Sequence, residues 1–210
     1  KTAYEIRPRD WSSDVCSSDL AAGVRVALGH SACRFEDAVA AAAAGATLVT
    51  HLGNGMRPLH QRDPGLLGAG LTEPRLVPSL IADGVHLHDA FLRLATTARP
   101  DAVLVSDAVA TGIEYFGTEV VARDGAAYLA DGTLTGATVM LDACVRRVVA
   151  VGVPPALAIS MASVHPARAV GLDTWGAVGV GGRADLVVLD PDTLRPRGVW
   201  IDGVRAAVAP

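Results

Sequence analysis

The sequence almost lacks lysine. Lys1 is the only lysine in the 210 residues, so every other basic side chain is an arginine. A chain rich in alanine and arginine indicates a GC-rich coding sequence. No cluster of basic residues occurs, and the formal net charge is −4. The charge pattern therefore gives no surface suited to the phosphate backbone of nucleic acids.

Cysteine is also scarce, with three residues in the chain. Cys33 and Cys144 are far apart in sequence and form neither a CxxC pair nor a disulfide framework. We expect a reducing, cytoplasmic location. Long apolar runs are missing as well, since a stretch such as "AVAAAAAGA" is too short to span a bilayer. No secretory signal is visible, and we expect no membrane association.

The first twenty residues form a tail of a different character. "DWSSDVCSSDL" has no apolar periodicity for a helix or a strand. A permitted reverse translation of this stretch looks like a widely used sequencing-library adapter, and "KTAYEI" reverse-translates to something resembling its other end. Residues 21–210, in contrast, contain no lysine and carry all their positive charge on arginine. Residues 1–20 are therefore interpreted as an artefactual or disordered tail and are left out of the prediction of the fold.

From residue 21 onward, short β-rich runs alternate with helical stretches, which is the pattern of a parallel sheet built from βα units. We expect strands at residues 24–30, 46–51 and 102–107, with a short strand or a strand end at 83–88. Helices are expected at residues 35–45, 74–82 and 90–98, with a long loop over residues 52–70. These elements predict an α/β fold of the (β/α) barrel kind.

The pattern changes after residue 107. Two Asp-Gly turns between apolar runs predict a small β-excursion over residues 119–134. Helical periodicity follows over residues 139–152, where Cys144 lies on the apolar face, and over 155–172. The last segment, 183–206, reads as strands of a separate β-layer.

Polar side chains end three of the predicted barrel strands: His30, His51 and Asp107. The carboxyl ends of barrel strands face the active site, so these groups should meet there, with His86 on the intervening unit. His30 and His51 are separated by about one βα unit, which places them on neighbouring strands. Imidazoles with a carboxylate suit a divalent transition metal such as zinc, and a carboxylate suits a general base. Taken singly, each residue could instead cap a helix or satisfy a loop.

Several blocks together resemble a known family. "VALGHS", "VTHLGNGMRPLHQRDPGLLGAGL", "IADGVHLH", "LVSDA" and "MASVHPARAVGL…GGRADLVVLD" are similar, in order and spacing, to the N-acetylglucosamine-6-phosphate deacetylase family of the amidohydrolase superfamily. The resemblance covers residues 21–210 and implies a TIM-type barrel with a small β-sandwich. We expect residues 1–20 as tail, 21–175 as the second half of the barrel, and 176–210 as strands of the sandwich.

The resemblance also implies roles for individual residues. His30 and His51 match metal ligands, and Asp107 matches the catalytic aspartate. The matching substrate contacts are His86, which helps orient the acetamide, the sugar-phosphate contacts Asn54 and Gly55, and Arg62, which reaches the phosphate of the neighbouring subunit's substrate.

The chain departs from the family pattern at Gly53 and Gly55, where the family usually has an aromatic residue and an alanine. His60 and His88 are expected at the surface or beside the site rather than as ligands, and His165 is expected in a turn. Arg57 is expected to be solvated.

The implied reaction is metal-dependent hydrolysis of the acetamide of N-acetylglucosamine 6-phosphate to glucosamine 6-phosphate and acetate. The cofactor would be zinc, with iron, cobalt or manganese as alternatives. A further glutamate ligand of the family lies upstream of the matched region and is absent here. The partners implied are a small amino-sugar phosphate and, in the intact protein, a second copy of the chain in a homodimer.

Two alternatives remain at this point. The chain could belong to another amidohydrolase that acts on a cyclic amide or a dipeptide. Such enzymes typically carry a lysine that bridges two metals, and residues 21–210 contain none. The chain could also be a non-functional truncation, because the segment supplies about half of the eight strands of a barrel.

Overall fold

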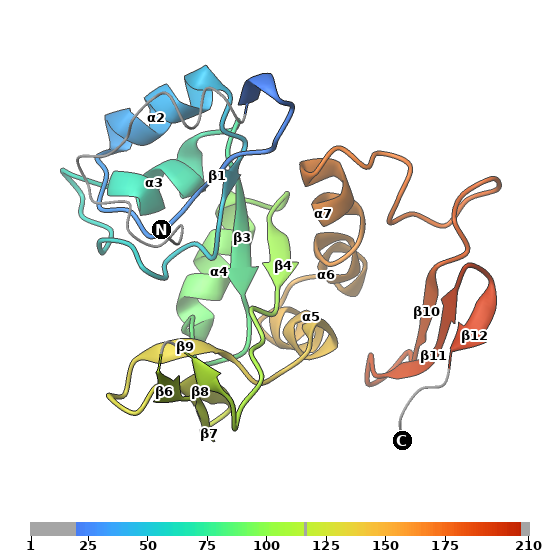
Figure 1. Cartoon of the computed structure of the whole chain (residues 1–210). Coiled ribbons are helices and arrows are strands. Elements are labelled where there is room, and N and C mark those ends of the chain that lie inside the picture. The colour runs from blue at the N-terminus through green and yellow to red at the C-terminus, as the bar shows by residue number, and fades with distance from the viewer. Residues whose placement is uncertain (1–19, 116, 207–210) are drawn as a thin grey trace. The chain divides into compact units, whose positions relative to one another are not determined.

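The structure is a computed structural model that describes residues 20–206 except Phe116. Figure 1 shows the course of the chain. The predicted tail lies outside the described residues apart from Leu20, whose carbonyl accepts a hydrogen bond from the amide of Gly23. The chain divides into two compact units, Lys1–Leu80 and Ile81–Pro210. This division differs from the domain boundaries expected from sequence, which stay a prediction.

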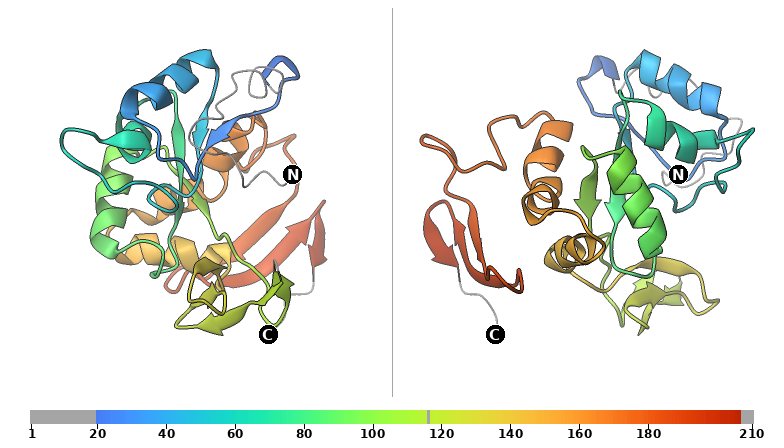
Figure 2. Two further views of the ribbon diagram at one scale, coloured as in Figure 1. Left: turned by 60° about the vertical axis from the view of Figure 1, so that its left-hand side comes forward. Right: turned by 180° about the vertical axis from the view of Figure 1, so that it is seen from behind.

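The first unit is built on short parallel strands covered by two helices. The strands are β1 (Ala27–Leu28), β2 (Leu48–Val49) and β3 (Val77–Ile81), and the helices are α2 (Phe35–Ala44) and α3 (Gly65–Thr72). β1 pairs with β2 and β2 pairs with β3, both in parallel. Helices α2 and α3 lie side by side (Figure 2). This is the βα pattern predicted from the sequence.

Helix α2 begins and ends where its sequence requires. Glu36 and Asp37 lie in the first turn, where negative charge favours the helix N-terminus, and the Asp37 carboxylate accepts a 3.0 Å hydrogen bond from the amide of Arg34. Most of the remaining residues of α2 are alanines, which have the highest helix propensity. Gly45 ends the helix in the left-handed region with φ 117°, a conformation that glycine adopts at little cost.

Two of the expected elements were wrong. Residues 74–82 were expected to be helical, but β3 runs through Val77–Ile81. Pro78 removes a backbone donor and would clash inside a helix, whereas the continuous apolar run suits a strand buried in a parallel sheet. Helix α3 instead lies in the stretch expected to be a loop. Its glycines allow close packing, since a Cβ on Gly70 would overlap the side chain of Leu52.

The second unit contains a helical part and several small antiparallel sheets. Its helices are α4 (Asp89–Ala98), α5 (Leu141–Ala150), α6 (Pro155–Met161) and α7 (Val164–Ala169). Its strands are β4 (Val103–Val105), β5 (Glu114–Tyr115), β6 (Thr118–Glu119), β7 (Val121–Arg123), β8 (Ala126–Tyr128), β9 (Leu134–Ala137), β10 (Leu186–Leu189), β11 (Pro196–Ile201) and β12 (Val204–Ala206). The segment 83–88, expected to be a short strand or a strand end, is a loop that follows the end of β3.

The small sheets match the change of pattern seen in the sequence. β7, β8 and β9 form an antiparallel sheet, β5 and β6 form a hairpin, and β10, β11 and β12 form a third sheet. Asp-Gly turns connect β7 to β8 and β11 to β12, with the aspartates Asp124 and Asp202 at φ 52° and 49°. Within the described residues, no helix has the length and apolar character needed to cross a bilayer.

Each unit has its own buried apolar residues. In the first unit these include Val49, Leu52, Leu76 and Leu80, all fully buried. In the second unit the fully buried set includes Leu92, Ala95, Val148 and Met161. The two faces of α4 differ in solvent exposure: Leu92 is 0% exposed and Leu94 is 51% exposed.

Replacing Leu92 by alanine should therefore reduce the free energy of unfolding by about 2–5 kcal/mol, because it removes buried methyl groups and leaves a cavity. Leu94→Ala on the same helix should change it by about 0.5 kcal/mol or less. Urea unfolding followed by circular dichroism measures both values. Equal losses for the two variants would contradict this assignment of the buried face.

Candidate functional site

The two histidines that end the first two strands lie together. β1 and β2 pair in parallel register, Ala27 opposite Leu48 and Leu28 opposite Val49, so both strands end at the same edge. His30 and His51 follow two residues later on each strand. Their ring centroids are 4.6 Å apart at an interplanar angle of 89°. Two imidazoles at this separation could donate nitrogens to a shared ion.

Three of the predicted site residues have unusual backbone conformations. His30, His51 and Asp107 have φ of 45°, 30° and 50°, in the left-handed region that side chains other than glycine rarely occupy. Each such residue costs of order 1–3 kcal/mol and persists only where its surroundings hold it. Residues of this kind gather at functional sites, so the three angles independently favour a functional role for the strand ends.

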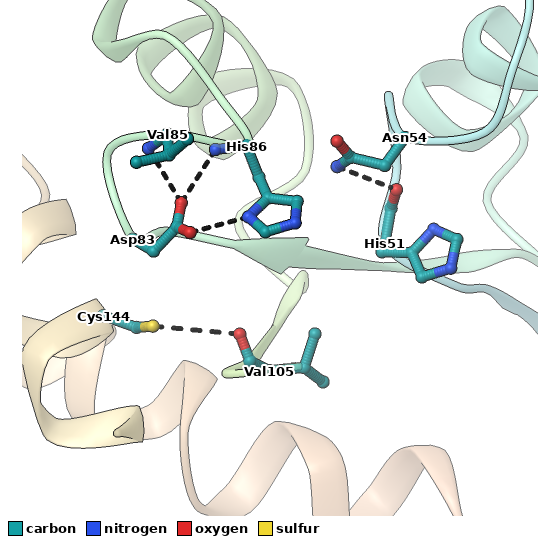
Figure 3. A network of polar contacts seen from close by, with 7 residues as sticks. All are labelled: His51, Asn54, Asp83, Val85, His86, Val105 and Cys144. Carbon is teal, nitrogen blue, oxygen red and sulfur yellow. Dashed lines mark hydrogen bonds and ion pairs between the residues drawn. The ribbon is translucent and has the colours of Figure 1, made fainter. Parts of the chain in front are cut away.

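The strained backbone of His51 is held from both sides. Its amide donates a 2.7 Å hydrogen bond to the hydroxyl oxygen of Ser79 on β3. Its carbonyl accepts hydrogen bonds from the backbone amide of Asn54, at 2.9 Å, and from the Asn54 side-chain amide, at 3.3 Å (Figure 3). Asn54, predicted to contact substrate, therefore also organises the turn that carries His51.

Gly55 approaches the other histidine. A Cβ built on Gly55 would lie 2.7 Å from Nδ1 of His30, and Gly55 itself has φ +61°. The absence of a side chain lets the loop pass against the imidazole ring. This is the position at which the sequence departs from the family pattern of alanine, and an alanine here would require the His30 ring to shift.

The loop beyond Gly55 carries exposed charge. Arg57 forms a 3.1 Å ion pair with Asp63, so it is paired with a carboxylate as well as solvated. The backbone amide of Arg62 donates to Nδ1 of His60 at 3.3 Å, and both residues are exposed. His60 thus lies at the surface, as expected, where its ring accepts the amide of Arg62, and the Arg62 side chain is exposed as well.

His86, in the second unit, is paired with a residue that the sequence analysis missed. Its Nδ1 lies 2.6 Å from a carboxylate oxygen of Asp83, and the two side chains are 5% and 0% exposed. Figure 3 shows the pair at the end of β3. The spacing Asp-x-x-His next to an Asp-Gly turn is the signal that could have identified Asp83, because a carboxylate three residues before a histidine can reach its ring.

Asp107 follows β4 in the second unit and is held through its main chain. Its carbonyl accepts a 2.9 Å hydrogen bond from the amide of Ala137, and the amide of Val109 donates 3.0 Å to the carbonyl of Ala137. β9 therefore pairs with the segment just after Asp107. A Cβ on Gly136 would lie 2.8 Å from the carbonyl oxygen of Asp107 and from Cγ1 of Val109, so only glycine fits without movement.

Two other histidines have structural roles. Nδ1 of His88 accepts a hydrogen bond from the amide of Ala90 and caps α4. Nδ1 of His165 lies 3.1 Å from the carbonyl of Ala102, which ties α7 to the start of β4. Cys144 is buried on α5 and burial raises the pKa of its thiol to about 11, so the thiol stays protonated at neutral pH.

No cluster of three or more His, Cys, Asp or Glu side chains able to hold a metal ion occurs within residues 20–206, Phe116 aside. His30 and His51 are therefore two donors of an incomplete set. The structure places them in the first unit and places His86 and Asp107 in the second, so the predicted convergence of all four groups stays a prediction.

These features define a class of protein: an α/β chain of parallel βα units with imidazoles at neighbouring strand ends. The model of the amidohydrolase family matches residues 16–206. The chain belongs to the amidohydrolase family, whose members are metal-dependent.

Two curated relatives are named as deacetylases of acetylated amino-sugar phosphates. The chain is 44% identical to an N-acetylgalactosamine-6-phosphate deacetylase of Escherichia coli O157:H7, over 88% of this chain and 51% of the relative. It is 41% identical to the N-acetylglucosamine-6-phosphate deacetylase of Rattus norvegicus, over 92% of this chain and 51% of the relative. The chain therefore spans about half the length of these curated relatives.

Solved structures of deacetylases have a fold similar to that of this chain. The crystal structure of N-acetylglucosamine-6-phosphate deacetylase from Pasteurella multocida is similar with a TM-score of 0.89 at 29% identity, covering 96% of this chain and 55% of that one. The D267A mutant of the Mycobacterium smegmatis enzyme, in complex with N-acetyl-D-glucosamine-6-phosphate, is similar with a TM-score of 0.84 at 34% identity, covering 94% of this chain and 55% of that one. The fold is thus part of an amidohydrolase barrel with an additional region of small sheets.

Gly136→Ala should destabilise the second unit by about 1–3 kcal/mol, because the new methyl group meets main-chain and Val109 atoms that cannot move freely. Hydrogen exchange of the Ala137 amide, which donates to Asp107, should accelerate in the same variant. Gly179→Ala is the matched control, since a Cβ there meets nothing within 4 Å. An unchanged Ala137 amide in Gly136→Ala would show that β9 does not hold Asp107.

Proposed function

We propose that this chain is the part of an N-acetylglucosamine-6-phosphate deacetylase that carries most of its active site. The enzyme hydrolyses the acetamide of N-acetylglucosamine 6-phosphate to glucosamine 6-phosphate and acetate. The observation that carries the proposal is the paired, strained His30 and His51 at adjacent strand ends, in a chain 40–44% identical to curated deacetylases of acetylated amino-sugar phosphates.

The two imidazoles fit part of a divalent metal site. Their rings lie 4.6 Å apart at one edge of a parallel sheet, and imidazole nitrogen is a preferred donor for zinc, iron, cobalt and manganese. We infer zinc as the metal, held by His30, His51 and a carboxylate from outside this chain. A bound divalent ion supplies a positive charge that acidifies water and polarises the amide carbonyl.

Asp107 is proposed as the general base and then the general acid. Its carboxylate accepts a proton from the attacking water as the water oxygen forms a bond to the carbonyl carbon. The same carboxyl then gives the proton to the amide nitrogen as the carbon–nitrogen bond breaks, which releases acetate and the free amine. The strained backbone of Asp107, held by Ala137, restricts where this carboxylate can lie.

The remaining predicted residues are proposed to bind the sugar phosphate. Asn54 and Gly55 lie on the loop after His51. The absence of a side chain at Gly55 leaves room for a ligand. Arg62 is exposed, and its planar guanidinium suits a phosphate group of the substrate bound to the other subunit of a homodimer. Within the described residues, Cys33 and Cys144 are free thiols, which is consistent with the cytoplasmic location inferred from the sequence.

The epimeric sugar phosphate is a second candidate substrate. The relative that is 44% identical carries the name N-acetylgalactosamine-6-phosphate deacetylase, and so does a putative one from Escherichia coli strain K12 that is 43% identical over 99% of its length. Both candidates require the same hydrolysis of an acetamide. They differ in the configuration of one hydroxyl group, so comparing kcat/KM for the two sugars decides between them.

The chain by itself is expected to be inactive. Strand β10 is apolar on both faces, yet Leu186, Val187 and Val188 are 36%, 55% and 48% exposed. A strand of this composition is normally covered on both sides. An isolated half of a barrel would also leave unpaired strand edges and an incomplete set of metal ligands.

The proposal predicts that this chain releases no acetate from N-acetylglucosamine 6-phosphate. A chain extended to the full length of its relatives should release it with added zinc, in an assay that measures free acetate and free amine. Acetate release by residues 21–210 at a rate comparable to that of the extended chain would refute the expected dependence on further residues. Absence of deacetylation by a folded, zinc-loaded extended chain would refute the proposed function.

In the extended chain, Asp107→Asn should lower kcat by about 10²–10⁴-fold, because a general acid–base group is removed. Its zinc content should stay unchanged, since His30 and His51 remain. Kinetics and elemental analysis of the same preparation test both statements. A variant within a few-fold of the parent enzyme would mean that another residue is the base.

A further inference from the structure

The Asp83–His86 pair is the most deeply buried ionisable pair among the side chains described above. Asp83 is fully buried and His86 is 5% exposed. One carboxylate oxygen of Asp83, Oδ1, accepts hydrogen bonds from the amides of Val85 at 2.9 Å and His86 at 2.8 Å. The other oxygen, Oδ2, lies 2.6 Å from Nδ1 of the His86 ring (Figure 3).

This arrangement decides which ring nitrogen carries the proton. Burial by itself would raise the pKa of Asp83, but the hydrogen bonds from the His86 ring and from the two amides outweigh burial and lower the pKa. Asp83 is therefore an ionised carboxylate at neutral pH and can only accept hydrogen bonds. The hydrogen in the contact with Asp83 must then belong to Nδ1 of His86, so Nε2 carries a lone pair in the neutral form of the ring.

The surroundings keep the loop that carries His86 in place. Gly84 has φ +87°, and a Cβ there would lie 3.1 Å from Cζ of Arg147, so the guanidinium lies directly against the main chain of the loop. Nε of Arg147 donates a 2.8 Å hydrogen bond to Asp89, the first residue of α4. The loop is thus held by Asp83 on one side and by Arg147 on the other.

The Cys144 thiol adds no competing negative charge near Asp83. Cys144 donates to the carbonyl of Val105 at 3.8 Å (Figure 3). Burial raises the pKa of this thiol to about 11, so it is neutral at physiological pH. The Asp83 carboxylate is therefore free of a neighbouring thiolate that would weaken its bond to the imidazole.

We propose that Asp83 is a positioning residue that fixes His86 as the Nδ1–H tautomer, so that Nε2 accepts a hydrogen bond from an N–H or O–H group of the substrate. This inference rests on the proposed function for the identity of the substrate, an acetylated amino-sugar phosphate. A bare Nε2 accepts a hydrogen bond from an N–H or O–H group and disfavours an oxygen that offers only lone pairs.

The tautomer can be measured without any activity. In the extended enzyme labelled with ¹⁵N-histidine, a long-range ¹H–¹⁵N spectrum distinguishes the protonated ring nitrogen from the bare one, and loss of one signal set in His86→Gln assigns His86. The expected result is a protonated Nδ1 and a bare Nε2. A protonated Nε2 in the neutral ring of the unmodified enzyme would overturn the proposal, whether or not the enzyme deacetylates its substrate.

Asp83→Asn provides the second measurement. The asparagine oxygen can still accept the amides of Val85 and His86, but its NH₂ group then faces Nδ1 and donates, which moves the ring proton to Nε2. We expect the tautomer to switch and kcat/KM to fall about 10–100-fold, a typical loss on removing a partner that orients a functional histidine. The loss should lie mainly in KM, because a substrate donor now meets a ring donor.

Asp142→Asn is the matched control. Asp142 is an aspartate of α5 that forms an ion pair with Arg146, and none of its described contacts involves the His86 ring. This variant should keep both the tautomer and KM. A switched tautomer with unchanged KM for Asp83→Asn, or an equal change in KM for Asp142→Asn, would show that Asp83 does not act on the substrate through His86. If Asp83→Asn fails to fold, the tautomer of the unmodified enzyme still decides the proposal.

Discussion

The parallel hydrogen-bonded register of β1, β2 and β3 is the constraint on which the candidate site depends. β1 and β2 are each only two residues long, so there is little redundancy in the pairing. A shift of one residue in the β1–β2 register would reverse the direction of every side chain on that strand and would separate His30 from His51. The buried residues of the first unit, Val49 and Leu80 among them, stabilise this single register because any other would expose them.

Strain at the strand ends is the second feature that ties structure to function. His30, His51 and Asp107 all have a positive φ. Each of them is contacted by residues outside its own strand. Ser79 and Asn54 bond to the main chain of His51, Gly55 lies against the ring of His30, and Ala137 bonds to the main chain of Asp107. These partners come from different parts of the sequence, so contacts distant in the chain hold the main chain of the proposed site residues.

The pair of Asp83 and His86 illustrates a more general relation between folding and chemistry. A buried carboxylate is unfavourable unless it is fully hydrogen-bonded. Asp83 meets this requirement with two amides of its own loop and one imidazole nitrogen, and the same contacts orient the imidazole ring. The stability of the loop and the hydrogen-bonding character of His86 therefore follow from one set of contacts.

The sequence by itself determined the α/β class, most of the helices and strands, and the candidate residues His30, His51 and Asp107. These features depend on local periodicity and on the residues at strand ends, which can be recognised from neighbouring positions in the sequence. The expected helix at residues 74–82 was wrong although Pro78 already disfavours a helix interior. The helix at residues 65–72 was missed because its glycines disfavour a helix locally, and only the packing of Gly70 against Leu52 explains that glycine. The sequence also did not identify Asp83 or Gly136, and it did not predict that Gly55 lies against the His30 ring. Their importance depends on contacts of a buried carboxylate, a carbonyl oxygen and an imidazole ring, and only the tertiary structure brings those atoms within a few ångströms of one another.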